Sequence, residues 1–562
     1  MKAAHRRPAP ESRKLEIRPK HWAARHDLVE QIFDSYAVGE AWDEMILPDG
    51  NPREHCAELH KVMSEMSRAE FEERCAERDR SFLDRGVTFS LSGEERPFPL
   101  DPVPRIISAA EWAVIEAGVV QRVRTLELFL EDVYGKGQVI GDGIIPRNLV
   151  FNSSLYKRQA FGISRPNGVR IHVAGIDVVR DQWGELRVLE DNVRTPSGVS
   201  YVLENRRAMT RIFPELLSSR PVRQVEDYPR HLLDALRSAA PVRAGSAPVV
   251  VVLTPGIHNS AYFEHSFLAR RMGVELVEGR DLVCRNNVVY MRTTGGERRV
   301  DVVYRRVDDD FLDPVFFRED SVIGCPGILN AARAGNVTIA SAVGNGVADD
   351  KLTYTYVPDL IRYYLGEEPV LKNVTTYRPE DPDQLNHILA RLGELVVKPV
   401  NASGGYGIVI GPQSRETELA IAAENLRARP RDFIVQELVT LSTAPTMAGS
   451  KFEPRHIDLR PFAVNSGDRI HVLPGGLTRV AMRPGSLIVN SSQGGGSKDT
   501  WVASEEICSA EPSAEHPISE AHFPGLDQAP PPHHGAIEIE VAQMQQQQQL
   551  RLAPACDGGR RC

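Results

Sequence analysis

The most informative part of this sequence is the stretch Gly175-Ile-Asp-Val-Val-Arg-Asp-Gln-Trp-Gly-Glu-Leu-Arg-Val-Leu-Glu-Asp-Asn192. Two apolar runs around a polar turn at 181–184 predict a β-hairpin. Asp177 lies near the start of the first strand, with Glu190 and Asn192 at the end of the second. The hairpin therefore folds these oxygens toward one another. Two carboxylates and an amide suit Mg²⁺, which proteins hold through a few carboxylates plus nucleotide phosphates. Taken alone, a surface hairpin with solvated acids is the commoner explanation, and the rest of the chain favours the metal.

The composition is that of an ordinary folded protein. The chain has 562 residues, of which 42% are hydrophobic and 25% charged, so we expect several structural units. A net charge of −9 argues against general binding to nucleic acids or anionic membranes. The seven cysteines are scattered, residues 1–20 lack an apolar signal segment, and no apolar run is long enough to cross a bilayer. We therefore expect reduced thiols and a cytoplasmic protein that binds neither nucleic acid nor membrane.

Changes in the hydrophobic pattern divide the chain into six parts. Apolar spacings of three and four residues predict three helices between 56 and 134, and strand–helix alternation after Pro248 predicts a small doubly wound sheet. The end of the chain is rich in Pro and Gln and poor in core residues. The six parts are a loose leader (1–40), a helical region (41–145), the hairpin region (146–245), the doubly wound sheet (246–345), a second folded unit (346–502) and a disordered tail (503–562).

A second motif is the strand Leu395-Val-Val-Lys398, which is followed by a glycine-rich turn at 403–407. Such a turn brings backbone N–H groups against phosphate oxygens, because glycine permits close approach. It matches neither a P-loop nor a dinucleotide-binding turn. The lysine on the preceding strand favours a phosphate site, with a purely structural turn as the alternative.

Further polar features follow downstream in a fixed order. Each is weak alone, because arginines in a hairpin are usually solvated and glycine-rich loops are usually linkers. A strand that ends in acceptors, however, suits an adenine amino group and ribose hydroxyls. The features are Gln436-Glu437 at the end of a strand, Asp458-Leu-Arg460, the later arginines Arg479 and Arg483, and the loop Asn490–Gly496.

Together these motifs resemble the ATP-grasp superfamily, which includes D-alanine–D-alanine ligase and glutathione synthetase. In that family an Asp-Lys pair, a Lys-Pro strand with a glycine loop, an adenine hinge, an Asp-x-Arg strand, an Asn-containing loop and a metal hairpin follow one another. Here the metal hairpin comes first, and Asp350-Lys351 opens the rest of the series. This order, with the wording Leu189-Glu-Asp-Asn-Val-Arg-Thr-Pro-Ser-Gly198, resembles the circularly permuted ATP-grasp family of bacterial proteins, relatives of the glutathionylspermidine-synthetase group. The resemblance covers residues 43–502.

The resemblance implies an α/β fold with α+β parts: a circularly permuted ATP-grasp core, a helical N-terminal region and a small doubly wound pre-ATP-grasp-like sheet. Residues 146–245 would form the permuted metal-binding part, 246–345 the substrate domain, and 346–502 the ATP-binding lid and core. The implied cofactors are ATP and Mg²⁺. The implied residues are Asp177, Glu190 and Asn192 for the metal; Lys351, Lys398, Ser403, Gly404, Gly405, Gly407, Gln436 and Glu437 for the nucleotide; and Lys398, Arg460 and Arg483 for catalysis.

The chain departs from the D-alanine ligase pattern at Gly175. That pattern has an arginine two residues before the first metal aspartate, and this chain has glycine there. The phosphate contact that the arginine would make must therefore come from another residue. Arg483 and Arg194 are the candidates.

The substrates are expected between the nucleotide unit and the doubly wound sheet, at the ends of its strands. For Arg305 and its neighbour Arg306 the alternative is a structural ion-pair cluster with the aspartates at 308–310. Those aspartates themselves suit a solvated acidic turn better than a metal site. The candidate substrate contacts are Asn259, Ser260, Tyr262, Glu264, Arg305 and Arg194.

The resemblance implies an ATP-dependent carboxylate–amine ligase, which forms an amide or peptide bond through an acyl phosphate and releases ADP and phosphate. A phosphotransferase on the same scaffold is one alternative. A non-catalytic nucleotide-binding partner protein is another, and the joint presence of the metal residues and both lysines argues against it. The substrates would be small-molecule or peptide carboxylates and amines. The sequence leaves open a homo-oligomer or a partner protein from the same operon.

Overall fold

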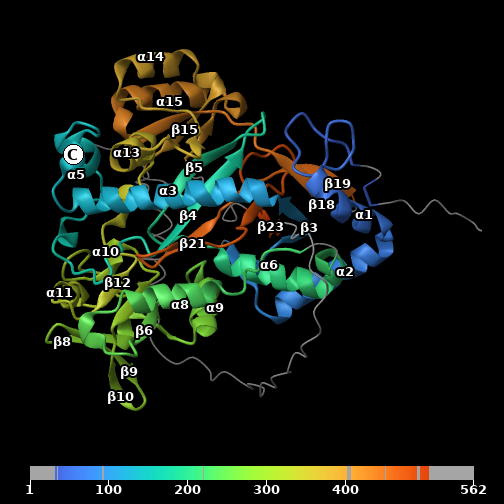
Figure 1. Ribbon diagram of the computed structural model, residues 1–562. Helices are drawn as coiled ribbons and strands as arrows, with labels where there is room; N and C mark the ends of the chain where they lie inside the picture. Colours follow the sequence, from blue (N-terminus) through green and yellow to red (C-terminus); the bar gives the residue numbers. More distant parts are fainter. Residues whose placement is uncertain are drawn as a thin grey trace, which may run out of the picture.

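The computed structural model describes residues 32–33, 36–91, 94–218, 221–400, 407–449, 451–489 and 494–504 (Figure 1). Within these ranges the strands form seven sheets, and helix α3 (Ala109–Val133) runs across the middle of the molecule. None of the helices in these ranges is long and apolar enough to cross a membrane.

The central sheet contains the predicted hairpin, formed by β4 (Val173–Arg180) and β5 (Leu186–Asn192). The strand order is β13-β5-β4-β20-β21. Apolar residues of α3 share one core with Ile176, Val178 and Val188, so α3 covers one face of this sheet. The antiparallel pairing of β4 with β20 places distant parts of the chain side by side. The other strands are β13 (Lys372–Asn373), β20 (Phe462–Asn465) and β21 (Ile470–Val472).

A smaller sheet carries the lysine strand β15 (Leu395–Pro399), in the order β14-β17-β15-β16. Its apolar residues Leu395, Val397 and Val435 form a separate small core with helices α14 (Pro382–Ala390) and α15 (Glu416–Ala428). Because side chains alternate along a strand, Lys398 projects from the opposite face. The remaining strands are β14 (Thr376–Tyr377), β16 (Val409–Ile410) and β17 (Phe433–Glu437).

The predicted doubly wound sheet is present as four parallel strands in the order β12-β11-β6-β7. Alternate residues of β6 belong to two different cores: Val250 and Val252 pack with α8 and α9, and Val251 packs with α11. The strands are β6 (Val250–Leu253), β7 (Glu275–Val277), β11 (Val302–Arg305) and β12 (Thr338–Ala340), and the helices are α8 (Tyr228–Ser238), α9 (Tyr262–Met272) and α11 (Ile328–Arg333).

Three strands of this region form a separate antiparallel sheet, in the order β10-β9-β8. Asn286 and Asn287 both have positive φ (51° and 59°), which is the turn that joins tightly paired antiparallel strands. This turn makes β8 and β9 a hairpin and removes them from the parallel sheet. The strands are β8 (Leu282–Arg285), β9 (Val288–Thr293) and β10 (Gly296–Arg299).

The region predicted as helical, residues 41–145, contains the three helices but also strands. Besides α3 these helices are α1 (Ala57–Glu65) and α2 (Arg68–Asp84). β3 (Leu100–Ile107) pairs in parallel with β23 (Gly496–Val502), which in turn pairs with β22 (Thr478–Val480). The segment predicted as a loose leader is packed at its end, because Phe33 stacks on His60 and Phe452. Two further pairs are β1 (Thr88–Leu91) with β2 (Glu94–Pro97) and β18 (Thr443–Ala448) with β19 (Lys451–His456).

Two large cores cross the part boundaries predicted from sequence. One includes residues from Ile107 to Val502 and the other from Ile32 to Trp501. The remaining α-helices are α4 (Gln138–Gly141), α5 (Arg147–Phe151), α6 (Val199–Ile212), α7 (Pro214–Ser218), α10 (Asp309–Leu312), α12 (Lys351–Tyr354) and α13 (Val357–Leu365). Short 3-10 helices are η1 (Glu54–Cys56), η2 (Arg158–Ala160), η3 (Val242–Ala244), η4 (Gly279–Asp281), η5 (Asn345–Ala348), η6 (Leu392–Glu394), η7 (Gly411–Gln413) and η8 (Pro430–Asp432).

Candidate active site

The hairpin register brings the predicted metal residues together. Asp177 stands directly opposite Glu190, and Gly175 stands opposite Asn192. The register shifts after Asp177, where Val178 pairs with Val188. Such a bulge twists the strand and redirects the side chains beside it. The oxygens of Asp177, Glu190 and Asn192 therefore share one end of the hairpin, as predicted from their spacing.

Asp177 is buried between two arginines. Arg460 donates from Nε to Asp177 Oδ1 (2.5 Å) and from its terminal nitrogen to Oδ2 (2.8 Å), and Arg479 donates to Oδ2 (2.6 Å). Burial alone would raise the pKa of Asp177, but Arg460 and Arg479 outweigh it and hold that pKa well below its usual range. Asp177 is thus a fixed negative charge.

Arg479 is the functional residue that sequence reasoning missed. It also donates to the buried Asp458, with Nε 3.0 Å from both carboxylate oxygens, so it joins Asp458 to Asp177. In sequence it was one arginine of a hairpin, a place where solvated side chains are usual. Only the pairing of the segment around Ile457 with Val480 of β22 brings it inward, and that pairing has no local signal.

Glu190 faces the two lysines. Withdrawal from water and the charge of Asp177 raise the pKa of Glu190, while Lys351, Arg460 and Lys398 lower it. Glu190 keeps 35% of its side chain exposed, whereas Asp177 keeps 1%. Glu190 is therefore the carboxylate of the pair that is open to a ligand. The two lysines are close enough to stabilise its negative charge.

Two elements position the lysines. Asp350 caps α12 by accepting from Leu352 N (2.9 Å) and is held by Ser153 (2.7 Å), which fixes Lys351 at the first position of the helix. Lys398 projects from β15 toward the hairpin. Burial and the neighbouring Lys351 lower the pKa of Lys398 to about 8, although Glu190 and Asp177 oppose the shift. Lys351 and Lys398 thus lie within electrostatic range of Glu190 despite their distance from it in sequence.

The predicted hinge residues point to opposite faces of the small sheet. Gln436 is buried beside Val396 and donates to Thr376 (3.0 Å), on the face that carries Lys398. Glu437 pairs with Leu395 on the helix face, where Arg391 (2.8 Å) and Tyr377 (2.6 Å) donate to it. The carboxylate of Glu437 is therefore already paired on the face away from Lys398.

Gly407 has φ +72°, and a β-carbon at this position would lie 3.1 Å from Cγ of Pro399. A side chain at this position would therefore be strained, which favours glycine. Ser403, Gly404 and Gly405 lie outside the described residues, as do residues 490–493 of the second glycine-rich loop.

The donor set fits Mg²⁺. Glu190 offers a carboxylate and Asn192 an amide oxygen, and Asn192 Nδ2 lies 3.4 Å from Glu190 Oε1. Three of the roughly four acceptor positions of the Asp177 carboxylate are taken by arginine donors, which leaves about one for a cation. Oxygen donors of this kind, supplemented by phosphates, are the coordination that Mg²⁺ prefers.

Arg460 occupies the space of the missing arginine at Gly175. A β-carbon on Gly175 would lie 3.2 Å from Cδ and 3.4 Å from Cγ of Arg460, and 3.0 Å from Cβ of Pro196. Gly175 therefore leaves room for an arginine that comes from another segment. Of the two candidates named from sequence, Arg194 is engaged by Asp349 (2.5 Å), and Arg483 is exposed in the loop after β22.

Two of the predicted substrate contacts, Glu264 and Arg305, are buried and have their charges paired within the fold. Glu264 is buried and accepts from Gly198 N (2.7 Å) and Ser200 N (3.1 Å), so it caps helix α6. Arg305 is fully buried and donates to three backbone carbonyls, of Ser341, Val307 and Ala342, besides pairing with Asp309 (2.9 Å). The structural ion-pair alternative is confirmed for Arg305.

The rest of that arginine–aspartate cluster is structural too. Arg306 donates to Pro196 O (2.9 Å) and Ser197 Oγ (2.7 Å), which anchors the loop after the metal hairpin. Asp308 and Asp310 pair with Arg194 (3.7 Å) and Lys157 (2.5 Å). Asn259 and Ser260, in the loop between β6 and α9, and Tyr262, the first residue of α9, are half-buried; Asn259 Oδ1 accepts from Ala261 N (2.9 Å). Those three remain candidates at the end of a parallel strand.

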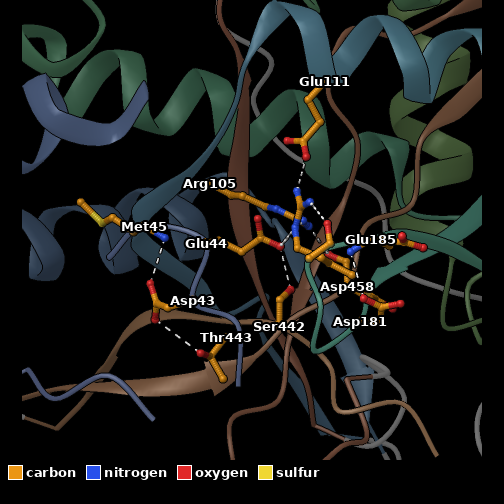
Figure 2. A network of polar contacts seen from close by, with 12 residues as sticks. Asp43, Glu44, Met45, Arg105, Glu111, Asp181, Glu185, Ser442, Thr443 and Asp458 are labelled. Carbon is orange, nitrogen blue, oxygen red and sulfur yellow. Dashed lines mark hydrogen bonds and ion pairs between the residues drawn. The ribbon is translucent and has the colours of Figure 1, made fainter. Parts of the chain in front are cut away.

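A buried polar network around Glu44 adjoins the site at Asp458 (Figure 2). Glu44 accepts from Arg105 (2.7 Å), Arg180 (3.0 Å) and Ser442 (2.7 Å). Burial would raise the pKa of Glu44, but the two arginines lower it to about 2. Arg105 also donates to the carbonyl of Asp458 (3.2 Å), the residue that holds Arg479. The N-terminal segment is thereby linked to the arginines that grip Asp177.

The fold and this arrangement of hairpin, lysines and arginines define the ATP-grasp class. A family model described as circularly permuted ATP-grasp type 2 matches residues 104–481, more than half of the chain. The chain belongs to this circularly permuted ATP-grasp family, which confirms the α/β fold and the family expected from the motif order.

Relatives extend over most of the chain. An uncharacterized protein of Mycobacterium leprae (strain TN) is 55% identical over 506 residues, covering 87% of this chain and 90% of that protein. A putative glutamate–cysteine ligase 2-2 of Frankia casuarinae is 46% identical over 483 residues, covering 85% of this chain and 56% of that protein. The structure of a glutathione synthetase-like effector from Globodera pallida, in its apo form, shares the fold, with a TM-score of 0.52 and 13% identity over 78% of this chain and 98% of that one.

Proposed function

We propose that this protein is an ATP-dependent ligase that joins a carboxylate to an amine through an acyl phosphate. One observation carries the proposal: Lys351 and Lys398 face the Asp177–Glu190 hairpin although more than 150 residues separate Lys351 from the hairpin in sequence. Cations opposite a hard-oxygen site are what the triphosphate of ATP with Mg²⁺ requires. Family membership supports the same assignment.

Each group has a distinct role in this proposal. Glu190 and Asn192, with the remaining acceptor position of Asp177, would hold Mg²⁺, which when bound neutralises phosphate oxygens. Lys351 and Lys398 would contact the phosphates, and Gly407 closes the loop proposed to cover them. Arg460, held by Asp177 and 3.7 Å from Glu190, takes the place of the arginine that Gly175 lacks. The adenine would lie on the face of the small sheet that carries Gln436, and Glu437 would contribute through its backbone only.

The proposed reaction has two steps. A carboxylate oxygen of the first substrate bonds to the γ-phosphorus of ATP, and the bond from that phosphorus to the bridging oxygen of ADP breaks. The amine nitrogen then bonds to the acyl carbon and loses a proton, while the carbon–oxygen bond to phosphate breaks. The products are an amide, ADP and inorganic phosphate. Fixed positive charge stabilises phosphoryl transfer without a protein nucleophile.

The substrates are proposed as a class only. The Frankia relative is named a putative glutamate–cysteine ligase, but the alignment spans 56% of that protein, so its name does not assign an amino acid to this chain. Small-molecule or peptide carboxylates and amines are proposed to bind beside Asn259, Ser260 and Tyr262, which follow β6. Arg483, which is exposed, is proposed as a further phosphate or substrate contact from its loop.

The test uses the full-length protein with ATP, Mg²⁺ and pools of amino acids and short peptides, with hydroxylamine added. An acyl phosphate is trapped as a hydroxamate, and ADP accumulates. AMP formation would contradict the mechanism, and a stable phosphorylated product would indicate the phosphotransferase. Glu190→Gln should abolish turnover while weakening ATP binding less. Lys398→Ala should raise the activation free energy derived from kcat/KM by about 2–4 kcal/mol. The exposed Lys61→Ala is the matched control and should turn over like wild type.

A further inference from the structure

A second cluster of metal-type ligands lies away from the candidate active site, where α8 meets the edge strand of the central sheet. Asp227 immediately precedes α8, His231 lies one turn into it, and His471 lies on β21. One ligand atom from each of the three lies within 4.8 Å of the other two. Asp227 and His231 are four residues apart, the spacing that puts two side chains on one face of a helix turn.

The contacts within this cluster leave polar atoms without partners. His231 Nε2 lies 3.1 Å from Asp227 Oδ2, and the rings of His231 and His471 stack with centroids 3.9 Å apart. Among the described residues, His471 Nε2 and Asp227 Oδ1 are buried and have no hydrogen-bond partner. Because buried polar atoms are normally paired, each such atom needs an explanation. A ligand shared by His471 Nε2 and Asp227 Oδ1 would explain why both atoms lack a partner.

We propose that Asp227, His231 and His471 bind a divalent first-row transition ion, with Zn²⁺ as the reference, and leave a fourth position for water. Two imidazoles and one carboxylate are the donor set of a zinc site with an open position. Imidazole suits zinc, copper and nickel, whereas carboxylates and carbonyls suit magnesium, so this cluster would not compete for the ion of the hairpin site.

The surroundings of the cluster are partly buried and positively charged. The ring of His471 is half-buried and stacks on that of His231. Arg469 and Arg223 also act on His471, and Arg230 lies 4.0 Å from Asp227. These cations disfavour an ion held by charge alone. They leave coordination by imidazole nitrogen as the main source of affinity.

Such an ion would complete the attachment of α8 to the β20–β21 hairpin. At the C-terminal end of α8, Ser238 Oγ donates to Ser466 O (3.3 Å), in the turn between β20 and β21. Asn167 donates to the same two groups, to Ser238 Oγ (3.2 Å) and Ser466 O (3.4 Å). The metal would tie the other end of the helix to β21. Both ends of α8 would then be fixed to the sheet that carries the metal hairpin.

The test titrates the full-length protein with Co²⁺ and Zn²⁺ in excess Mg²⁺, following Co²⁺ absorption and the melting temperature. We expect one tight site with the intense absorption of four- or five-coordinate Co²⁺, and a higher melting temperature with Zn²⁺. His231→Ala and His471→Ala should each weaken affinity by about 100-fold, judged from losses of about 10–100-fold for outer-shell partners alone. Asp227→Asn keeps the shape of the side chain, so it tests the site even if a histidine variant misfolds.

The tail of the sequence contains another histidine pair, His533-His534, which supplies the matched control. The double variant His533→Ala/His534→Ala should keep the tight Co²⁺ site and the Zn²⁺ effect on melting. The proposal is overturned if metal binding survives in His231→Ala, His471→Ala and Asp227→Asn, or if it is lost only in the tail variant. Weak octahedral Co²⁺ spectra in wild type would overturn it equally.

Discussion

The lowered pKa of Lys398 predicts that ATP binding weakens at alkaline pH. In the free protein the pKa is about 8, so about nine molecules in ten carry the charged lysine at pH 7 and about one in ten at pH 9. ATP phosphates favour the charged form. The sign is therefore that affinity falls as pH rises through the free-protein pKa, by about tenfold between pH 7 and 9.

A tenfold change is about 1.4 kcal/mol. That is less than the roughly 2–4 kcal/mol expected for a lost phosphate contact, so the bound lysine should stay charged up to pH 9 and the whole tenfold decline should be observed. Equilibrium binding of ATP with Mg²⁺, by calorimetry from pH 7 to 10, measures it without interference from ionisation of the substrate amine. Lys398→Arg should flatten the profile, because arginine keeps its charge throughout.

Lys61→Ala, an exposed lysine on α1, should reproduce the wild-type curve. A wild-type affinity that is constant from pH 7 to 9.5 would refute the placement of Lys398 on the phosphates. So would an equal decline in Lys398→Ala, since another group would then be titrating.

Three other substitutions test the geometry. Arg479→Ala should lower the free energy of unfolding by about 3–5 kcal/mol in urea, because the buried Asp177 and Asp458 lose a shared partner; a change under 1 kcal/mol would contradict the buried pairing. Gly175→Ala should cost about 1–3 kcal/mol and weaken ATP binding, because the added carbon meets Arg460; wild-type affinity would show that Arg460 is not the phosphate arginine. Burial lowers the pKa of His172 to about 4, so as pH falls the unfolded chain takes up a proton before the folded chain does. This histidine should therefore lower the free energy of unfolding by about 1.4 kcal/mol per pH unit between about 6.5 and 4. A His172→Gln variant whose stability falls with the same slope in acid would disprove this.

The site was predictable where it lay within one local element. The hairpin holds Asp177 and Glu190 opposite each other because two strands and a turn fix the register, and all three signals are local. Lys398 was found because it ends a buried strand before a glycine-rich loop. That these residues lie near one another could be predicted only from the order of the motifs, since no local pattern joins β5 to β15.

The failures share one cause, which is burial decided by distant segments. Glu264 lies after strand β6 and Arg305 ends strand β11, which are places where substrate contacts often occur. In the folded chain, however, their charges are paired with backbone groups of other segments. Arg479 reads as a solvated arginine until β22 pairs with the segment around Asp458. Strand β3 was overlooked because its prolines, Pro102 and Pro104, disfavour strand, yet a parallel neighbour at one edge tolerates them.

The pairing of β3 with β23 also delays completion of this sheet during biosynthesis. Lys498 bonds Asp101, 397 residues earlier in the chain. At about 5–20 residues per second, a ribosome needs about 20–80 s to deliver the matching strand. During that interval β3 is an open edge, the kind of surface that recruits wrong neighbours. Arg479 is made 302 residues after Asp177, so nascent chains should depend on chaperones in proportion to how slowly the residues between them are made.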